Sequence, residues 1–224
     1  MPDDSDPDVP VSTRICTNLQ GWVTDMTVLV GSEGRPSVFI SRSVLVGTKI
    51  GRGRTVGAMR TADIQALFDF TYWADRQILR AAAALPSDDF TRPVAITYRN
   101  LRGTLVHTLD VEMSWRRRLR GEPQEVWDAS LSVDDYPTAD VLADAWASDE
   151  AEMHAWLASL NDEELAAIAD LGNTDRFPLW YYLVHIVTHS EQQRRDAQII
   201  LAHFGHEPPD LEFLYYADSR VEVD

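Results

Sequence analysis

Apolar residues recur at three- and four-residue spacing in four separate segments of this chain, and all four lie after residue 58. The segments span residues 59–85, 99–120, 137–160 and 179–204. This period matches the turn of an α-helix, so each segment presents one apolar face and one polar face. Helices of this length bury their apolar faces against one another, and strand patterns are scarce after residue 58. The sequence therefore predicts an all-α domain folded as an antiparallel four-helix bundle.

Glycine and proline mark the ends of these segments. Gly121 and Gly205 follow the second and fourth segments, as glycines that end helices do. Pro137 and Pro178 stand where the third and fourth helices are expected to begin. The connection over residues 121–136 is long, which predicts one crossover across the end of the bundle.

Residues 1–58 have a different composition, rich in Gly, Ser, Val and Thr and without helical periodicity. The stretches TVLVG and SVFISRSVLVG alternate weakly, as short strands do. Two interpretations stay open for this extension. It is either a peripheral or disordered segment that precedes a native start at Met59, or a small β-structured appendage. In both cases the bundle is expected over residues 59–218, followed by a short tail at 219–224.

The charge and composition of the chain argue against several classes of partner. Its 224 residues include 36 acidic and 20 basic side chains, a net charge of −16, while residues 1–58 are neutral overall. This acidic surplus repels a phosphate backbone, so nucleic-acid binding is not expected, and the RRRLR run at 116–120 suits the last turns of a helix. No run of 18 apolar residues is present, so no membrane span is expected. With Cys16 as its single cysteine and an acidic N-terminus, the chain is expected to be cytoplasmic.

Histidines on two of the expected helices are candidates for a metal site. His185 and His189 lie one helical turn apart in the fourth segment, and His107 lies among apolar residues in the second. Three neutral imidazoles from facing helices would hold Zn²⁺ or Ni²⁺ and leave one coordination position open. The alternative is structural, with His107 as a buried, hydrogen-bonded histidine and the pair on a solvated face. Spacing alone leaves both interpretations open.

Two blocks of the sequence resemble the DinB family, a group of four-helix-bundle metalloproteins distinct from the DNA polymerase of similar name. The blocks are RGTLVHTLDVEMSWRRRLRG in the second segment and PLWYYLVHIVTHSEQQRRDAQIILAHFGHEPPDLEFLYY from the fourth segment onward. The family has a histidine followed five residues later by a glutamate, then His-x-x-x-His-Arg-x-(Glu/Gln) and a Gly-x-x-Pro-x-x-x-(Asp/Glu) ending. The residues that match or nearly match are His107, Glu112, His189, Arg194, Asp196, Gly205, Pro208 and Glu212. The likeness covers about residues 59–218.

The resemblance implies three metal ligands, one on the second helix and two that lie one turn apart on the fourth. Carried over, these positions are His107, His189 and Gln193, so a glutamine replaces the third histidine of the family. An amide oxygen is a weaker donor to Zn²⁺ or Ni²⁺ than an imidazole. His185, one turn before His189, is the other candidate for the third ligand. A site that has lost its metal is the remaining alternative.

The resemblance also implies a range of functions. Some DinB-like proteins are S-transferases or isomerases that use a low-molecular-weight thiol such as mycothiol or bacillithiol, because an open metal position can bind a thiol as its thiolate. Glu112 and Arg194 are expected beside such a centre, with Glu112 orienting a ligand histidine. The alternative is a non-enzymatic, stress- or damage-inducible metal-binding bundle with a degenerate site. Metal-dependent hydrolysis would need a general base, which the sequence does not single out.

Members of the family form homodimers through faces of the bundle, so a homodimer is expected. Six aromatic residues are candidates for a surface shared between subunits: Trp180, Tyr181, Tyr182, Phe213, Tyr215 and Tyr216. Burial of these side chains within one subunit is the competing interpretation.

Overall fold

The computed structural model describes residues 28–30, 36–38, 59–172 and 176–220. The chain divides into two units, residues 1–54 and 55–224. In the first unit, β1 (Val28–Val30) pairs antiparallel with β2 (Pro36–Val38). Both strands overlap the stretches whose alternation predicts strands. The rest of the extension over residues 1–58 lies outside the described residues.

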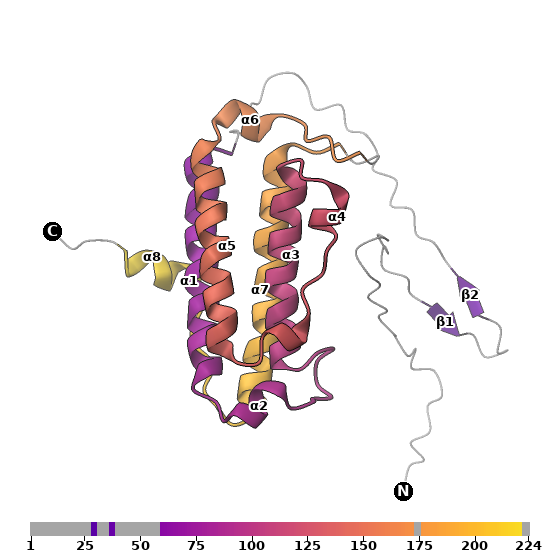
Figure 1. Ribbon diagram of the computed structural model, residues 1–224, viewed down its shortest axis with the longest axis vertical. Coiled ribbons are helices and arrows are strands. Elements are labelled where there is room, and N and C mark those ends of the chain that lie inside the picture. Colours follow the sequence, from indigo (N-terminus) through magenta and orange to yellow (C-terminus); the bar gives the residue numbers. More distant parts are fainter. Residues whose placement is uncertain (1–27, 31–35, 39–58, 173–175, 221–224) are drawn as a thin grey trace, which may run out of the picture. The chain divides into compact units, whose positions relative to one another are not determined.

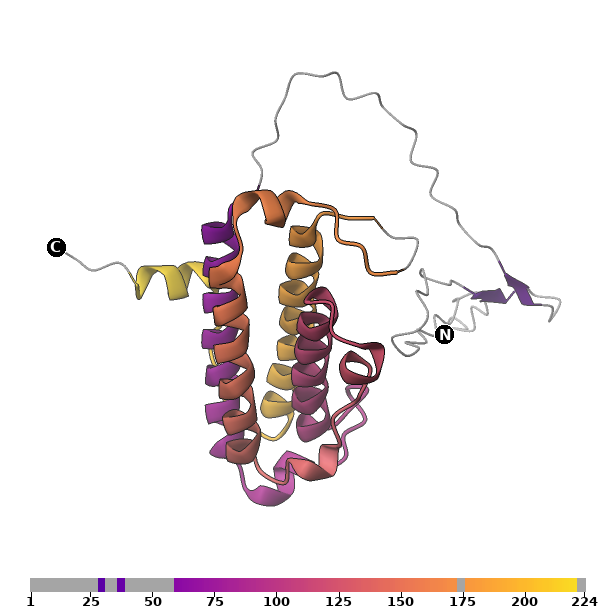
Figure 2. The same cartoon turned by 45° about the horizontal axis from the view of Figure 1, so that its top comes forward.

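The second unit contains four long helices, α1 (Thr61–Ala83), α3 (Leu101–Leu119), α5 (Ala139–Ser159) and α7 (Leu179–His203). Shorter helices occur between and after them: α2 (Ser87–Thr91), α4 (Gln124–Trp127), η1 (Val133–Asp135), α6 (Asp162–Ala166) and α8 (Phe213–Asp218). α1 lies beside α5, α3 lies beside α7, and α1 also packs on α7 (Figure 1, Figure 2). The all-α, four-helix-bundle fold expected from the sequence is confirmed. None of the described helices is long and apolar enough to cross a membrane.

Local sequence determines where the long helices begin and end. The Asn100 side chain accepts the backbone N–H of Gly103 at 2.8 Å, which caps the start of α3. Gly205 takes a left-handed φ of +80°, which ends α7 at no steric cost. α5 begins at Ala139, after Pro137, because the Thr138 hydroxyl accepts a first-turn N–H at 3.3 Å.

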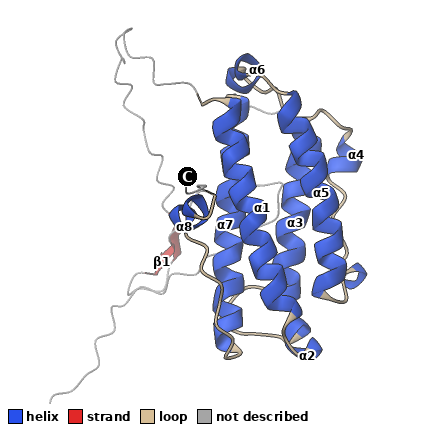
Figure 3. Cartoon of the chain, turned by 90° about the vertical axis from the view of Figure 1, so that its left-hand side faces the viewer, coloured by secondary structure: helices blue, strands red, loops and turns tan. Residues whose placement is uncertain are grey.

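The connection between α3 and α5 runs back along α3, whereas a crossover at the end of the bundle was expected. Three contacts follow its course: Ser114 Oγ donates to the Trp127 carbonyl at 2.5 Å, Asp110 Oδ1 accepts the Leu131 N–H at 2.8 Å, and Arg102 pairs with Asp134 at 3.3 Å. α3 and α5 therefore start at the same end of the bundle and run parallel, while α1 and α7 run the opposite way (Figure 1, Figure 3). The returning segment therefore lies over the face of α3 that carries His107.

The interior of the bundle is mostly apolar but includes several charged side chains. Phe68, Leu109, Leu142, Met153 and Leu183, from all four long helices, have no exposed surface. Within the four long helices as described, the buried charged residues are Asp75, Glu112, Arg116, Asp149 and Arg194. Ionisable groups removed from water destabilise the fold unless they are paired. Their partners therefore restrict how the helices can pack.

The six aromatic residues expected at a subunit interface differ in exposure. Tyr182 and Tyr216 are buried within the subunit, Trp180 is half-buried, and Tyr181, Phe213 and Tyr215 are exposed. Exposed aromatic side chains suit an interface, although Phe213 also contacts Phe70 of α1 with ring centres 5.1 Å apart. The homodimer stays a prediction.

Candidate metal centre between helices α3 and α7

The imidazoles of His107 on α3 and His189 on α7 face each other where these helices pack. Their ring centres are 5.4 Å apart, with the ring planes at 73°. Two imidazoles that share one tetrahedral Zn²⁺ at the usual N–Zn distance have ring centres about 5 Å apart. In the described part of the chain, the Nδ1 atom of His189 is buried and has no hydrogen-bond partner. The spacing and the unpartnered nitrogen both fit a shared metal ion.

Both imidazoles are neutral at neutral pH. Burial lowers the pKa of His107 to about 4, and the positive charge of Arg99 adds to this effect. Burial likewise lowers the pKa of His189 to about 4, with smaller contributions from the neighbouring histidines and Arg99. A neutral imidazole has a free ring-nitrogen lone pair, which is the form that binds metal ions.

His185 lies farther along the same groove between α3 and α7. Its ring centre is 6.4 Å from that of His189 and 5.3 Å from that of Trp115, against which it packs edge to face. Trp115 follows His107 by eight residues on α3, a rise of about 12 Å along the helix axis. His185 would therefore have to leave Trp115 and move toward His107 to share an ion with it.

Gln193 lies on the opposite side of His189 from His185. α3 and α7 run antiparallel, and Trp115 of α3 faces His185 of α7. A step of eight residues back along α3, from Trp115 to His107, therefore corresponds to a step of about eight residues forward along α7, from His185 to position 193. From this register we expect position 193 to lie near His107, whose ring centre is 5.4 Å from that of His189, and Gln193 is half-buried. The register thus favours the amide oxygen of Gln193 as the third donor.

Among the described residues, no group of three or more His, Cys, Asp or Glu side chains is placed to hold one metal ion. Two imidazoles and one amide do not conflict with that result, because glutamine is not one of these residue types. The donor set therefore fits a metal ion bound more weakly than three imidazoles would bind it.

A family comparison covers most of this unit. The model of the DinB family matches residues 59–223. The chain belongs to the DinB family. Among solved structures, a DinB-like protein from Bacillus cereus ATCC 10987 has 14% sequence identity and a TM-score of 0.56 over 68% of this chain and 98% of its own. At this identity the likeness shows the fold, and the comparison with curated protein sequences gives no match.

Glu112 of this DinB-family chain lies next to the candidate centre without facing open solvent. Its carboxyl accepts the Trp146 indole N–H at 3.0 Å and shares a very short hydrogen bond with the Ser190 hydroxyl. Burial and nearby carboxylates raise the pKa of Glu112 well above its usual range. Because Ser190 follows His189 directly, Glu112 fixes the backbone of α7 beside the candidate ligand. Glu112 was expected to orient a ligand histidine, and that role stays a prediction.

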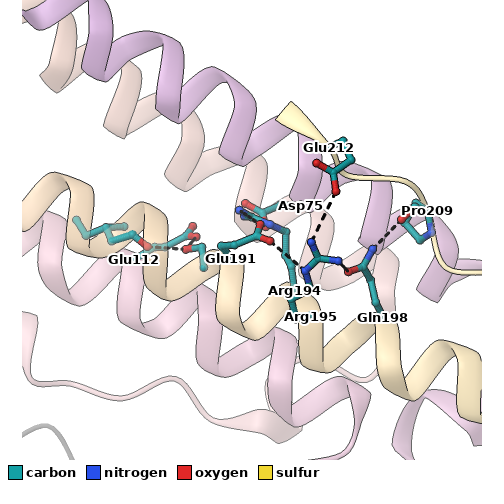
Figure 4. Close-up of polar contacts among 10 residues, drawn as sticks. Asp75, Glu112, Glu191, Arg194, Arg195, Gln198, Pro209 and Glu212 are labelled. Carbon is teal, nitrogen blue, oxygen red and sulfur yellow. Dashed lines mark hydrogen bonds and ion pairs between the residues drawn. The ribbon is translucent and has the colours of Figure 1, made fainter. Parts of the chain in front are cut away.

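Arg194 belongs to the packing of α7 against α1. Its guanidinium donates to Asp75 at 2.9 Å and pairs with Glu191 at 3.3 Å (Figure 4). Arg194 lies five residues after His189, about 140° around the helix, so the two side chains leave α7 on different faces. Burial raises the pKa of Asp75 to about 6, and the Arg194 charge opposes the rise.

The structure also pairs two charged residues that the sequence analysis did not select. Arg116 donates through Nε to Asp149 of α5 at 2.9 Å and through Nη1 to Glu152 at 2.6 Å. The RRRLR run lies in the last turn of α3 and just after it, as its sequence predicts, and its first arginine, Arg116, is buried. Asp149 lies on the apolar stripe of α5, and a charge within such a stripe is the signal that could have revealed the pair.

His107 also lines a pocket. It has a volume of about 440 Å³ and lies between α3 and the segment that returns along it. Its lining includes Arg99, Asn100, Gly103, His107, Asp110 and Leu131. His107 is therefore shared by the candidate metal centre and by a space large enough for a small ligand.

Proposed function

We propose that this DinB-family protein binds a divalent transition metal, Zn²⁺ or Ni²⁺, through His107, His189 and the amide oxygen of Gln193. The observation that carries the proposal is the 5.4 Å separation of two neutral, half-buried imidazoles on facing helices. The unpartnered Nδ1 atom of His189 adds support, because a buried polar nitrogen without a partner destabilises the fold.

We further propose that the centre serves thiol-dependent S-transfer or isomerisation with a low-molecular-weight thiol. A bound divalent metal would supply a Lewis acid that lowers the pKa of a thiol. The three protein donors are uncharged, so they leave the positive charge of the ion uncompensated and favour an anionic partner such as a thiolate. In S-transfer the sulfur forms a bond to an electrophilic carbon, the thiol proton passes to solvent, and the leaving group takes the bonding electron pair.

The chain holds this donor set in place through its packing. Glu112 fixes α7 through Ser190, and the ion pair of Arg194 with Asp75 fixes the adjacent turn of α7 against α1. Donors on two packed helices keep their separation better than donors on a loop, so the site is preorganised for a small ion.

Metal uptake tests the proposal. Wild-type protein and the variants His107→Ala, His189→Ala and His203→Ala are dialysed against Zn²⁺ or Ni²⁺, then against metal-free buffer, and their metal content is measured. We expect wild type and His203→Ala to retain about one ion per chain, because His203 is exposed near the end of α7. His107→Ala and His189→Ala should retain none while keeping wild-type helicity. A wild-type protein that stays metal-free would refute the metal centre, and metal uptake without thiol-dependent activity would limit the function to metal binding.

A further inference from the structure

We propose that the pocket beside His107 binds the carboxylate of the substrate and that Arg99 recognises it. The proposal deepens the proposed function, because His107 belongs both to this pocket and to the metal centre. The substrate class it names is a small thiol, or an S-conjugate of one, that carries a carboxylate a few bonds from the sulfur.

The lining of the pocket favours a ligand that reaches His107 from the side of the returning segment, because Leu131 and Val133 line it and none of the described residues of α7 does. Its volume of about 440 Å³ is formed by the first half of α3, the residues before it, and Leu131 and Val133 of the returning segment. Pockets of this size accommodate small organic ligands. One end of such a ligand would lie at His107 and the other at the start of α3, where Arg99 lies.

Arg99 has no carboxylate partner among the described residues, unlike the arginines that precede and follow it in the chain. Neighbouring arginines are paired, Arg92 with Asp89 at 2.5 Å and Arg102 with Asp134 at 3.3 Å. Within the described residues, no carboxylate oxygen lies at ion-pair distance from the Arg99 guanidinium. The guanidinium instead packs over the ring of Tyr98, 4.8 Å from its centre. A guanidinium that lines a pocket and has no protein carboxylate at ion-pair distance can bind the carboxylate of a ligand in bidentate geometry.

The stem of Arg99 is held against α3. A Cβ atom added to Gly103 would lie 3.4 Å from the Cβ and 3.7 Å from the Cδ of Arg99, so the stem covers this glycine. The same added atom would lie 3.1 Å from Asn100 Oδ1. The absence of a side chain at position 103 therefore lets Arg99 rest on the helix and keeps this end of the pocket open.

The charge of Arg99 acts on the candidate metal centre. It contributes to the lowered pKa of both His107 and His189, and it opposes the rise that burial causes in the pKa of Asp196. Asp110 also lines the pocket, and its carboxylate accepts the Leu131 N–H at 2.8 Å. In a chain with a net charge of −16, this local cation is what would let an anionic ligand approach.

Two thiols test the proposal: 3-mercaptopropionate and its neutral amide, 3-mercaptopropanamide. They differ only at the end remote from the sulfur, where one has a carboxylate and the other a carboxamide. Each is titrated into full-length wild type, Arg99→Gln and Arg92→Gln, in zinc-loaded and metal-free form, and binding is followed by amide chemical-shift changes. We expect wild type to prefer the acid by about tenfold, as a charge-assisted guanidinium–carboxylate contact implies. Arg99→Gln should lose the preference and keep its affinity for the amide, its zinc content and its fold. Arg92→Gln should keep the preference.

Equal affinity of wild type for the acid and the amide would overturn the proposal, as would an unchanged preference in Arg99→Gln. The metal-free arm separates this proposal from the proposed function. An Arg99-dependent preference in a protein that takes up no zinc would support the carboxylate pocket and refute the metal centre. Zinc uptake without any preference for the acid would support the metal centre and refute the carboxylate pocket.

Discussion

Glu112 on α3 accepts the indole N–H of Trp146 on α5 at 3.0 Å, and both side chains are buried. Its second oxygen lies in short hydrogen-bond contact with the Ser190 hydroxyl of α7, so one carboxyl joins three of the long helices. Ser190 also lies 3.1 Å from the Ile186 carbonyl, which can only accept. A hydroxyl has one proton, so with Ser190 donating to Ile186 the proton between Ser190 and Glu112 belongs to Glu112. We therefore predict a neutral Glu112 carboxyl in the native protein, and burial and nearby carboxylates shift its pKa in the same direction, well above the usual range.

A neutral Glu112 can be replaced by its amide with little loss. Glu112→Gln should change the free energy of unfolding by less than about 1 kcal/mol, because the amide donates to Ser190 and accepts from Trp146. Glu112→Ala leaves both partners unsatisfied and a cavity, and should cost about 2–4 kcal/mol. Urea unfolding of the metal-free proteins measures both values. A loss for Glu112→Gln as large as that for Glu112→Ala would show that the native carboxyl is ionised.

The Asp75–Arg194 ion pair predicts strongly non-additive mutations. Arg194→Met leaves the Asp75 carboxyl buried without its partner, and should cost about 3–5 kcal/mol of stability. Combining it with Asp75→Leu removes both buried charges, so the double variant should be closer to wild type than Arg194→Met alone. Arg195→Met, at the exposed neighbouring position, is the matched control and should cost less than about 1 kcal/mol. Additive losses in urea unfolding would contradict a coupled pair.

The third metal ligand can be identified by substitution. Gln193→His should tighten zinc binding by about tenfold or more, because an imidazole is a better donor to Zn²⁺ than an amide. His185→Ala should leave zinc affinity nearly unchanged, since His185 packs on Trp115. Competition with a chromogenic chelator measures both affinities. If His185→Ala loses zinc as completely as His107→Ala, His185 is the ligand and the register argument is wrong.

The lowered pKa values of His107 and His189 predict that the metal-free protein loses stability on acidification. Their pKa values are about 4 in the folded chain, against 6.5 for an ordinary imidazole. A base whose native pKa is depressed is protonated preferentially in the unfolded chain, so stability falls as pH drops from about 6.5 to about 4. The raised pKa of Asp75, about 6, acts in the opposite direction, so the comparison must cancel it. The stability of wild type relative to His107→Gln/His189→Gln, measured by urea unfolding at several pH values, should decrease with acidification. A constant difference would contradict the depressed values.

A chain that starts at Met59 should fold as the full-length protein does. All the long helices and the buried apolar residues of the described bundle lie after this position. We expect the helical circular dichroism signal per molecule and the urea midpoint to match those of the full chain. An unfolded shortened chain beside a folded full-length chain would show that residues 1–58 contribute to the stability of the bundle.

The sequence by itself determined the long helices, the four-helix bundle and the family. These features depend on local periodicity, on caps such as Asn100 and Gly205, and on residue blocks within single helices, all of which can be read along one segment. His107 and His189 were also selected as partners from the sequence, because a histidine among apolar residues and the family blocks pointed to the same positions.

Tertiary structure alone decided which side chains meet across the helices. The register of α3 against α7 places His185 on Trp115 and His189 opposite His107, a relation that depends on the relative shift of two helices distant in the chain. The buried partners of Arg116 and Arg194, and the raised pKa of Glu112, depend on desolvation within the assembled bundle. The sequence around a charged residue does not by itself show whether its side chain faces water or the core. Only the packed helices set its dielectric surroundings and its partners, and these determine its ionisation and its role.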